Sequence, residues 1–315
     1  LDLDPGAIHQ VGLEQVAKIH AQMVKTMQES GFKGSFPEFL KFLRTDPQFH
    51  AKTPEELLMR SAWVAKQVDG QLGKFFGRLP RQRFAIVPVA PDIAPYYTSG
   101  RGGASAYLVN TYDLPSRPLY NVAALTLHES APGHSLQLAL AAEQKGQPAF
   151  RRQGYISAYG EGWGLYSEYL GNEMGIYKTP YDRFGYLTYQ MWRACRLVVD
   201  TGIHHMGWTR QQAIDYLTDN TARSEREIAN EVDRYISWPG QALSYELGYL
   251  KILELRRKAE QDLGTRFDIR HFHDTLLEIG SVPLPVLEQR IDRFIEEGGP
   301  EPAFGCDCAK DRGKS

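Results

Sequence analysis

The feature that most restricts the fold is Pro132, which lies inside an apolar segment of helical character at residues 120–146. Proline has no backbone N–H, and its ring clashes with the carbonyl group four residues earlier, which here belongs to His128. Gly133 follows it and tolerates backbone angles that other residues avoid. The sequence therefore predicts a bulge or a break in this helix between His128 and His134.

Most of the remaining chain also has helical patterns, with apolar residues at helical spacing and Ser or Thr caps before several segments. Two segments, 83–91 and 105–113, have the β-branched and aromatic composition of strands, and residues 96–105 between them are expected to form a loop. The expected helices are 8–28, 35–45, 53–80, 120–146, 155–176, 180–206, 209–220, 224–236, 240–262, 268–279 and 284–297.

These patterns predict a mainly α protein with a small β-sheet placed before the helix that carries the two histidines. The chain contains no repeat of fixed period and no low-complexity linker. We therefore expect residues 1–315 to form a single domain, with a helical part at 1–80 and a part at 81–315 that contains the small sheet, further helices and the candidate metal site.

The charge balance gives no reason to expect a nucleic acid or an anionic membrane as a partner, because 36 basic residues face 38 acidic ones. No segment approaches the ~20 apolar residues of a membrane-spanning helix. No signal peptide is recognisable, but the first residue is not Met, so the sequence does not decide the compartment. The sequence also leaves open whether the protein forms a homodimer.

Cysteine is rare in this chain. Cys195 lies in an apolar helical segment and is expected to be a packed thiol. Cys306 and Cys308 lie in a charged tail without the two further ligands that a zinc site would need, so we assign them no role.

His128 and His134 are candidate metal ligands. On a straight helix a spacing of six residues would point them about 240° apart, but the predicted break could bring both to one metal ion. Glu129 stands beside His128, as a base next to a catalytic zinc ion would. The alternative is that the two histidines are ordinary core residues.

A third ligand is expected from the segment AYGEGWGLYSEYLGNEMG at residues 158–175. Glu161 and Glu168 are seven residues apart and hence on one helix face. Glycines around Glu161 would let another helix approach, which favours Glu161 as the ligand, with Glu168 accepting a hydrogen bond from a ligand histidine. The alternative for Glu168 is a solvated or arginine-paired carboxylate.

The motifs HESAPGHSLQ and EGWGLYSEYL, together with 196–208, 231–248 and 267–284, resemble the bacterial domain-of-unknown-function 885 family over about residues 8–297. That family is placed in the zincin-like, gluzincin-type metallopeptidase superfamily. The resemblance implies a helical zinc-peptidase fold and suggests that this chain corresponds to the C-terminal, metal-bearing half of a longer parent. It also implies that His128, His134 and Glu161 bind the metal and that Glu129 is the base.

Other residues could complete such a mechanism. His204 is a candidate donor to the oxyanion, with Tyr235 and Tyr245 behind it, and Arg234 could bind a substrate carboxylate. Each has a structural alternative: His204 as a helix cap, the tyrosines as core residues, and Arg234 as an ion-pair partner of a neighbouring acid.

The sequence thus predicts a zinc-dependent peptidase that hydrolyses short peptides. Two alternatives remain, a metal-dependent hydrolase of a non-peptide amide and a non-catalytic helical scaffold with a degenerate site. Two His and one Glu also suit manganese, cobalt or iron, and the full-length parent could be periplasmic or secreted.

Overall fold

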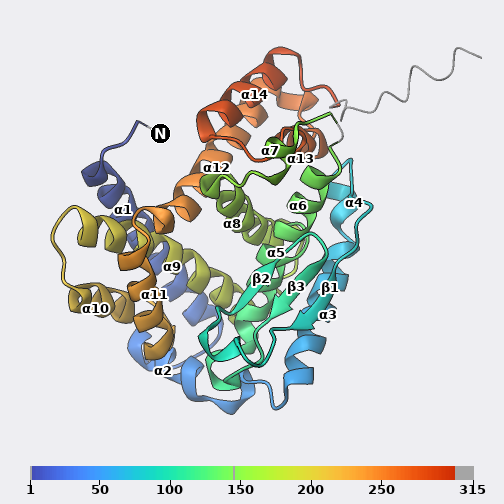
Figure 1. The fold of residues 1–315 in the computed structure, drawn as a ribbon. Helices are drawn as coiled ribbons and strands as arrows, with labels where there is room; N and C mark the ends of the chain where they lie inside the picture. The colour runs from blue at the N-terminus through green and yellow to red at the C-terminus, as the bar shows by residue number, and fades with distance from the viewer. Residues whose placement is uncertain (1, 145, 302–315) are drawn as a thin grey trace, which may run out of the picture.

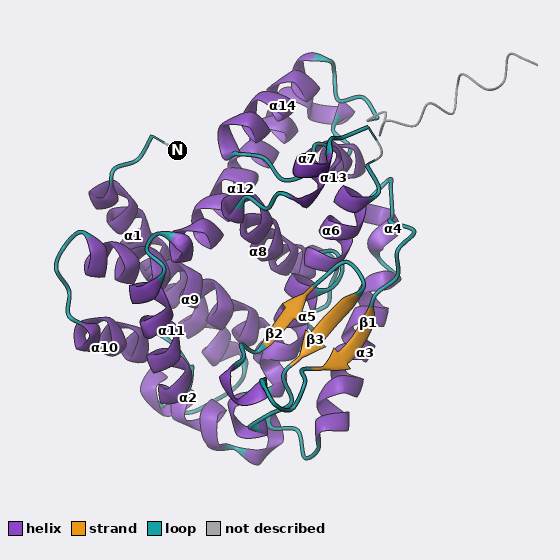
Figure 2. Cartoon of the chain, viewed as in Figure 1, coloured by secondary structure: helices purple, strands orange, loops and turns teal. Residues whose placement is uncertain are grey.

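A computed structural model describes residues 2–144 and 146–301 of the chain. In this part the protein is mainly helical and contains one small sheet, as the sequence predicts (Figures 1 and 2). None of the helices described is long and apolar enough to cross a membrane. Cys306 and Cys308 lie outside the described residues.

Helix α9 (Pro180–His204) is the central element of the fold (Figure 1). A capping box starts it: the Thr179 side chain accepts from the Asp182 backbone N–H, and Asp182 accepts from the Thr179 N–H. Residues around its whole circumference are buried, which is typical of a helix inside a large core. α1 (Pro5–Glu29) packs along it, and Cys195 is buried in it, as expected.

Helices α8 (Ser157–Glu173) and α12 (Ser244–Leu263) form a second closely packed pair. One cluster of buried apolar side chains runs from Val16 to Phe294 and joins this pair to the α1–α9 pair. Besides α5 and α6, described below, the remaining α-helices of the described residues are α2 (Phe36–Thr45), α3 (Pro54–Asp69), α4 (Leu72–Phe75), α7 (Ala149–Gln153), α10 (Arg210–Asn220), α11 (Glu225–Ser237), α13 (Ile269–Glu278) and α14 (Leu284–Glu296).

The helix expected over 53–80 is shorter than predicted. Its start is correct, since the Thr53 side chain accepts from the Glu56 N–H. α3 ends at Asp69 with Gly70 as its C-cap, and only the short α4 follows. Glycine is a poor helix former, and Gly70 outweighs the apolar periodicity where α3 ends.

The sheet has the order β1-β3-β2 and contains a strand that the sequence does not predict. β1 (Ala85–Pro88) pairs with β3 (Ala106–Val109), and these are the two predicted strands; their pairing is parallel. β2 (Gly100–Gly102), in the segment expected to be a loop, pairs antiparallel with β3 and forms an edge of the sheet. Two glycines give this segment no strand propensity, so its conformation comes from the pairing with β3.

The helix break predicted at Pro132 is present. α5 (Val122–Glu129) ends before it, and α6 (His134–Ala142) begins directly after Gly133. A Cβ atom on Gly133 would lie 1.9 Å from the His128 carbonyl oxygen, so the chain can fold back this closely only at a glycine. As a result His128 comes from the last turn of one helix and His134 from the first turn of the next.

Candidate metal centre

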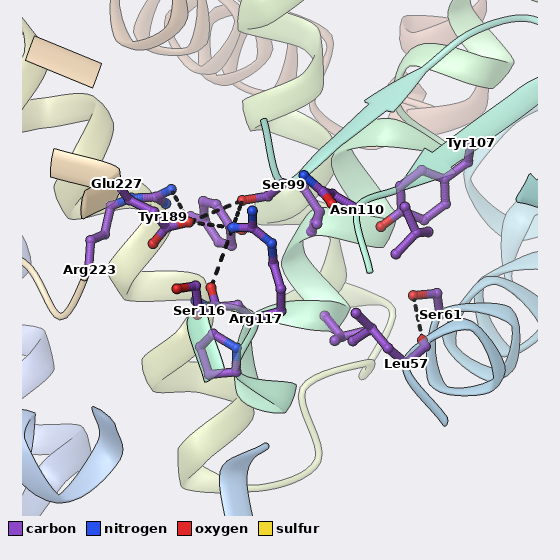
Figure 3. A pocket seen from close by; sticks show the side chains of 15 residues that line it. Leu57, Ser61, Ser99, Tyr107, Asn110, Ser116, Arg117, Tyr189, Arg223 and Glu227 are labelled. Carbon is purple, nitrogen blue, oxygen red and sulfur yellow. Dashed lines mark hydrogen bonds and ion pairs between the residues drawn. The ribbon is translucent and has the colours of Figure 1, made fainter. Parts of the chain in front are cut away.

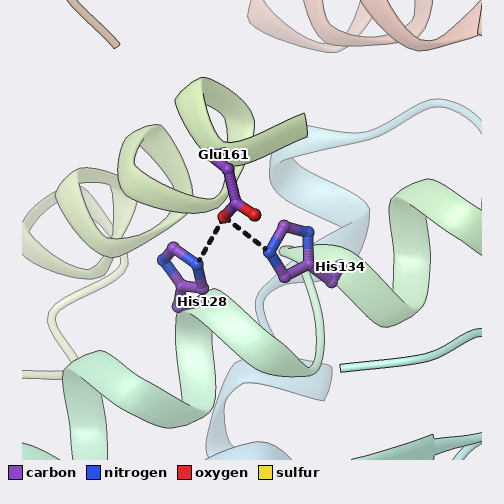
Figure 4. Close-up of side chains that lie close together, drawn as sticks. All are labelled: His128, His134 and Glu161. Atoms are coloured by element: carbon purple, nitrogen blue, oxygen red, sulfur yellow. Dashed lines mark hydrogen bonds and ion pairs between the residues drawn. The ribbon is translucent and has the colours of Figure 1, made fainter. Parts of the chain in front are cut away.

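His128, His134 and Glu161 come together in one cluster, with both histidine rings directed at the glutamate (Figure 4). The distance from Glu161 Oε2 is 3.4 Å to His128 Nε2 and 3.2 Å to His134 Nε2. The two imidazole rings are nearly perpendicular, with their centroids 4.8 Å apart. The structure thus brings together the three residues that the sequence predicts as ligands.

Glycines at the contact points allow this close approach. A Cβ atom on Gly164 of α8 would lie 2.6 Å from the His128 ring, and one on Gly102 of β2 would lie 2.7 Å from the His134 Cβ atom. Any larger residue would push α8 or β2 away from the histidines. The glycines around Glu161 therefore have the effect expected from the sequence, at Gly164 in particular.

Two distances in the cluster match those between the ligand atoms of a tetrahedral metal ion. Ligand atoms that surround zinc at about 2.1 Å in a tetrahedron are about 3.4 Å apart. The two histidine–glutamate distances are 3.4 and 3.2 Å, and all three ligand atoms lie within 4.8 Å of one another. Two imidazole nitrogens and one carboxylate oxygen also form a common ligand set of catalytic zinc.

Glu168 holds the ring of His128 in place. It is fully buried, and its Oε1 accepts a hydrogen bond of 2.8 Å from His128 Nδ1. This bond keeps the proton on Nδ1 and leaves Nε2 free for a metal. Arg193 Nη2 lies 3.4 Å from the same oxygen, so both the predicted histidine contact and the arginine-paired alternative are present.

The charges of the cluster favour a cation. Burial acts to lower the pKa of His128, but hydrogen bonds with Glu161 and Glu168 outweigh it and raise that pKa to about 9. Burial acts to raise the pKa of Glu161, but His134 and His128 outweigh it and hold this pKa well below its usual value. The buried carboxylates therefore stabilise positive charge where the imidazole nitrogens meet.

Glu129 lies next to the ligands, at the edge of the sheet. Its Oε2 accepts a hydrogen bond of 2.6 Å from the Gly102 backbone N–H. This contact fixes the carboxylate between His128 and β2. The predicted base is therefore placed where α5 meets the free edge of the sheet.

Tyr155 is a residue of the site that sequence reasoning misses. Its hydroxyl donates a hydrogen bond of 3.0 Å to Glu161 Oε1, and its ring centroid lies 6.4 Å from that of His134. The side chain is 45% exposed, so it stands between the cluster and solvent. Desolvation at the hydroxyl and the charge of Glu161 raise its pKa, so Tyr155 remains a hydrogen-bond donor at neutral pH.

His204 and Tyr235 have contacts that favour their structural alternatives. His204 is exposed at the end of α9, and its Nε2 lies 3.0 Å from the Tyr235 backbone oxygen. The buried Tyr235 hydroxyl accepts hydrogen bonds from Trp192 and from Arg196. Among the described residues, no hydrogen bond joins either of them to the three ligands.

Tyr245 and Arg234 connect the cluster with a neighbouring pocket. The Tyr245 ring stacks on His128 with centroids 6.3 Å apart, and Gln241 Nε2 lies 3.5 Å from its hydroxyl. Arg234 donates to Gln241 Oε1 at 2.6 Å and to Glu231 at 3.2 Å. It also lines a pocket formed by the segments 95–99, 112–117 and 223–234. Arg234 thus has its predicted ion-pair neighbour and also a place from which it could bind a substrate.

Two histidines outside the cluster, His271 and His273, have structural contacts. His273 is buried, with Nε2 at 2.8 Å from the Tyr166 hydroxyl and Nδ1 at 2.8 Å from the Phe75 carbonyl oxygen. Burial lowers its pKa to about 3, so it stays neutral. His271 lies 3.3 Å from the Gly299 carbonyl oxygen.

Fold and site together define a helical protein with a two-histidine, one-glutamate cluster assembled on a broken helix. The sequence profile of the family described as "Bacterial protein of unknown function (DUF885)" matches residues 1–291, and the chain belongs to this family. No curated protein matches the chain.

Two solved structures are similar to this chain. A protein from Colwellia psychrerythraea, described as a "putative lipoprotein", has a TM-score of 0.91 and 35% sequence identity, covering 94% of this chain and 53% of the other. A "putative lipoprotein of unknown function" from Shewanella oneidensis has a TM-score of 0.75 and 22% identity, covering 91% and 56%. The second shows likeness of fold alone. The chain spans about half the length of both proteins.

Proposed function

We propose that this protein is a zinc-dependent peptidase of the zincin-like superfamily that hydrolyses short peptides. The observation that carries the proposal is the convergence of His128 Nε2 and His134 Nε2 on Glu161, at distances that fit a tetrahedral ion. Glu129 beside the cluster and Glu168 behind His128 supply the two carboxylates that such a site needs in addition.

The residues around the cluster would divide the chemistry among them. Bound zinc would supply a Lewis acid that lowers the pKa of a water molecule to ~7. Glu129 would accept the proton of that water and pass it to the leaving amine. Tyr155, which contacts Glu161, and Tyr245, whose ring stacks on His128, are the candidates to donate hydrogen bonds to the carbonyl oxygen as negative charge develops on it.

The free edge of β2 is suited to hold an extended peptide next to these groups. Ser99 and Gly103 form hydrogen bonds with the neighbouring strand segment, at 3.0 Å from Asn110 N to Ser99 O and 2.8 Å from Gly103 N to Ala106 O. Residues of an antiparallel strand bond alternately to the partner strand and to the opposite side, so the backbone groups of Gly100 and the carbonyl group of Gly102 point to the free edge. The Gly102 N–H on that side is already bonded to Glu129. Edge-strand pairing binds peptides by their main chain and tolerates varied side chains.

Metal content is the first test of the proposal. We expect about one zinc per chain in the wild type, measured by plasma mass spectrometry after purification without chelators and reconstitution with zinc. His134→Ala, which removes one of three ligands, should retain little zinc. His205→Ala, a change at an exposed histidine at the end of α9, is the matched control and should bind zinc like the wild type.

Zinc-loaded protein should then be tested with a panel of short peptides and acylated amino acids. Cleavage of peptides supports the proposal, and cleavage of non-peptide amides alone favours the alternative hydrolase. Absence of zinc from the wild type, even after zinc is offered back, contradicts the proposal and leaves the scaffold alternative.

We also infer that the parent protein is exported. The support is the description of both similar structures as lipoproteins, and their length of about twice this chain leaves room for further segments. Fractionation of cells that express the full-length parent tests this inference, and recovery in the cytoplasm would contradict it.

A further inference from the structure

A pocket rich in arginine lies at the other end of β2 from the metal centre. It has a volume of about 240 Å³ and is lined by the segments 95–99, 112–117 and 223–234. Ser99, which directly precedes β2, lines it together with Arg117 and Arg223. A smaller cavity of about 30 Å³ shares these three residues with the pocket (Figure 3). β2 therefore runs from this pocket to Glu129.

The charged groups of this pocket are not balanced. Arg117 and Arg223 both pair with Glu227, at 2.6 and 3.1 Å (Figure 3). In the same way, Glu231 is shared by Arg196 at 2.8 Å and Arg234 at 3.2 Å. Two carboxylates thus serve four guanidinium groups, although Arg196 does not line the pocket. The lining residues themselves include four arginines, with Arg226, and three acids, with Asp113, so an excess of positive charge remains.

Some donors of these arginines have no partner in the described part of the chain. Arg223 is only 8% exposed, and its Nε has no hydrogen bond. The Nε of Arg117, buried at that atom, has none either. Unpaired buried donors are costly, and they add to the excess of positive charge at the pocket, which a bound anion would offset. A carboxylate suits a guanidinium because its two oxygens match the fork of N–H groups.

The length of β2 relates this pocket to the metal centre. From Ser99 to Gly102 the strand advances three residues, or about 10 Å at ~3.4 Å per residue. Antiparallel pairing is the more stable arrangement per residue. A peptide paired antiparallel to β2 has its N-terminal side near Gly102 and its C-terminal side near Ser99.

We infer that the pocket lined by Arg117, Arg223 and Arg234 is a carboxylate-binding subsite, which anchors a peptide by an acidic group two or three residues on the C-terminal side of the bond at the metal centre. This inference rests on the proposed peptidase function for the position of that bond. The carboxylate is either the free C-terminus of a short peptide or an acidic side chain, and both have the same chemistry.

Peptide binding tests the inference separately from hydrolysis. The zinc-loaded Glu129→Gln protein is titrated by calorimetry with tetra-alanine as the free acid and as the C-terminal amide. We expect the acid to bind about 10- to 100-fold more tightly, the range that corresponds to a charge-assisted hydrogen bond. Equal affinities, or no binding of the acid at millimolar concentration, would overturn the subsite.

Two pocket variants locate the effect. Arg234→Gln, a change at a half-buried residue, and Arg223→Gln should each reduce the preference for the acid to less than about threefold. Arg210→Gln is the control, because Arg210 pairs with Asp233 on the exposed side of α11 and does not line the pocket. If Arg223→Gln does not fold, Arg234→Gln alone decides. A full preference retained in Arg234→Gln overturns the inference.

Two further experiments distinguish a C-terminal carboxylate from an acidic side chain, and the subsite from the peptidase function. A tetrapeptide amide that ends in Glu is compared with one that ends in Gln, and tighter binding of the first assigns the subsite to acidic side chains as well. Wild-type protein that hydrolyses the acid and the amide with equal kcat/KM retains the peptidase function and loses the subsite. Protein that binds the acid selectively but hydrolyses neither peptide retains the subsite and loses the peptidase function.

Discussion

The two ends of β2 differ in the sign of the charge that is in excess around them. At the Gly102 end, the carboxylates of Glu129, Glu161 and Glu168 surround the two histidines of the cluster. Acidic groups dominate there, and they stabilise positive charge at the point where the imidazole nitrogens meet.

At the Ser99 end the excess has the opposite sign, because four arginines share Glu227 and Glu231. Burial acts to raise the pKa of Glu231, but the charges of Arg196, Arg234 and Arg223 outweigh it and lower this pKa. Glu227 and Glu231 are therefore already paired with arginines.

The difference shows how buried charge can indicate a ligand before any ligand is known. Burying an unpaired charge is costly, so a persistent excess of one sign is retained where an ion of the other sign can bind. By this criterion one end of β2 is suited to a cation and the other to an anion. The following substitutions test the comparison, from the largest expected effect to the smallest.

The largest effect is expected from Glu129→Gln. Loss of the base should reduce peptide turnover by about 10²- to 10⁴-fold, while zinc per chain stays at the wild-type level because Glu129 is not one of the three ligands. Steady-state kinetics and metal analysis on the same preparation measure both quantities. Glu55→Gln on the exposed face of α3 is the control. Turnover at the wild-type rate would show that Glu129 is not the base.

An intermediate effect is expected from Glu168→Gln. The amide can still accept from His128 Nδ1, but it lacks the charge that makes Nε2 a stronger ligand, so zinc should bind about 10- to 100-fold more weakly. Competition with a chromogenic chelator measures the zinc affinity. Glu173→Gln is the matched control, since Glu173 also lies on α8 and pairs with an arginine, Arg256. Equal zinc affinities in both variants would remove Glu168 from the site.

The smallest effect is expected from Glu246→Gln, at a buried carboxyl group whose charge is opposed by Glu168 and favoured by Arg193. Both Glu246 oxygens lack hydrogen-bond partners among the described residues. Burial raises the pKa of Glu246 to about 8, above its ordinary value of 4.5. The neutral acid is therefore favoured in the folded state, and its contribution to stability is present below pH 4.5 and is lost as the pH rises toward 8.

Urea unfolding at pH 5 and pH 8 measures this contribution. The variant should lose less stability than the wild type between the two pH values, by about 1–2 kcal/mol, because relaxation around a buried charge reduces the full effect. Glu254→Gln, at an exposed position of the same helix, is the control. Parallel pH profiles of the wild type and Glu246→Gln would contradict the assignment.

The sequence is most informative where one residue restricts the backbone. Pro132 and Gly133 predict the break between α5 and α6, because one removes a helical hydrogen bond and the other permits a close return of the chain. The glycines around Glu161 predict that another segment packs closely against α8, because glycine has no side chain to prevent it. Gly164, which lies against the ring of His128, is an example. These features are local, so they can be recognised without knowledge of the fold.

Other parts of the site depend on contacts between segments and have no local pattern. β2 has no strand propensity and forms only by pairing with β3. Tyr155 is close to Glu161 in sequence but lies just before α8 begins, so the spacing of a helix face does not indicate their contact. The arginines of the pocket come from segments more than 100 residues apart in the sequence, Arg117 and Arg223 among them.

The free edge of β2 also affects how the protein avoids self-association. An exposed sheet edge can pair with any extended chain, including the edge of a second molecule, and this is a route to aggregation. β2 limits that risk because it is only three residues long and its central residue, Arg101, is exposed and charged. Lengthening this strand or replacing Arg101 with an apolar residue would make the edge a template for intermolecular sheets.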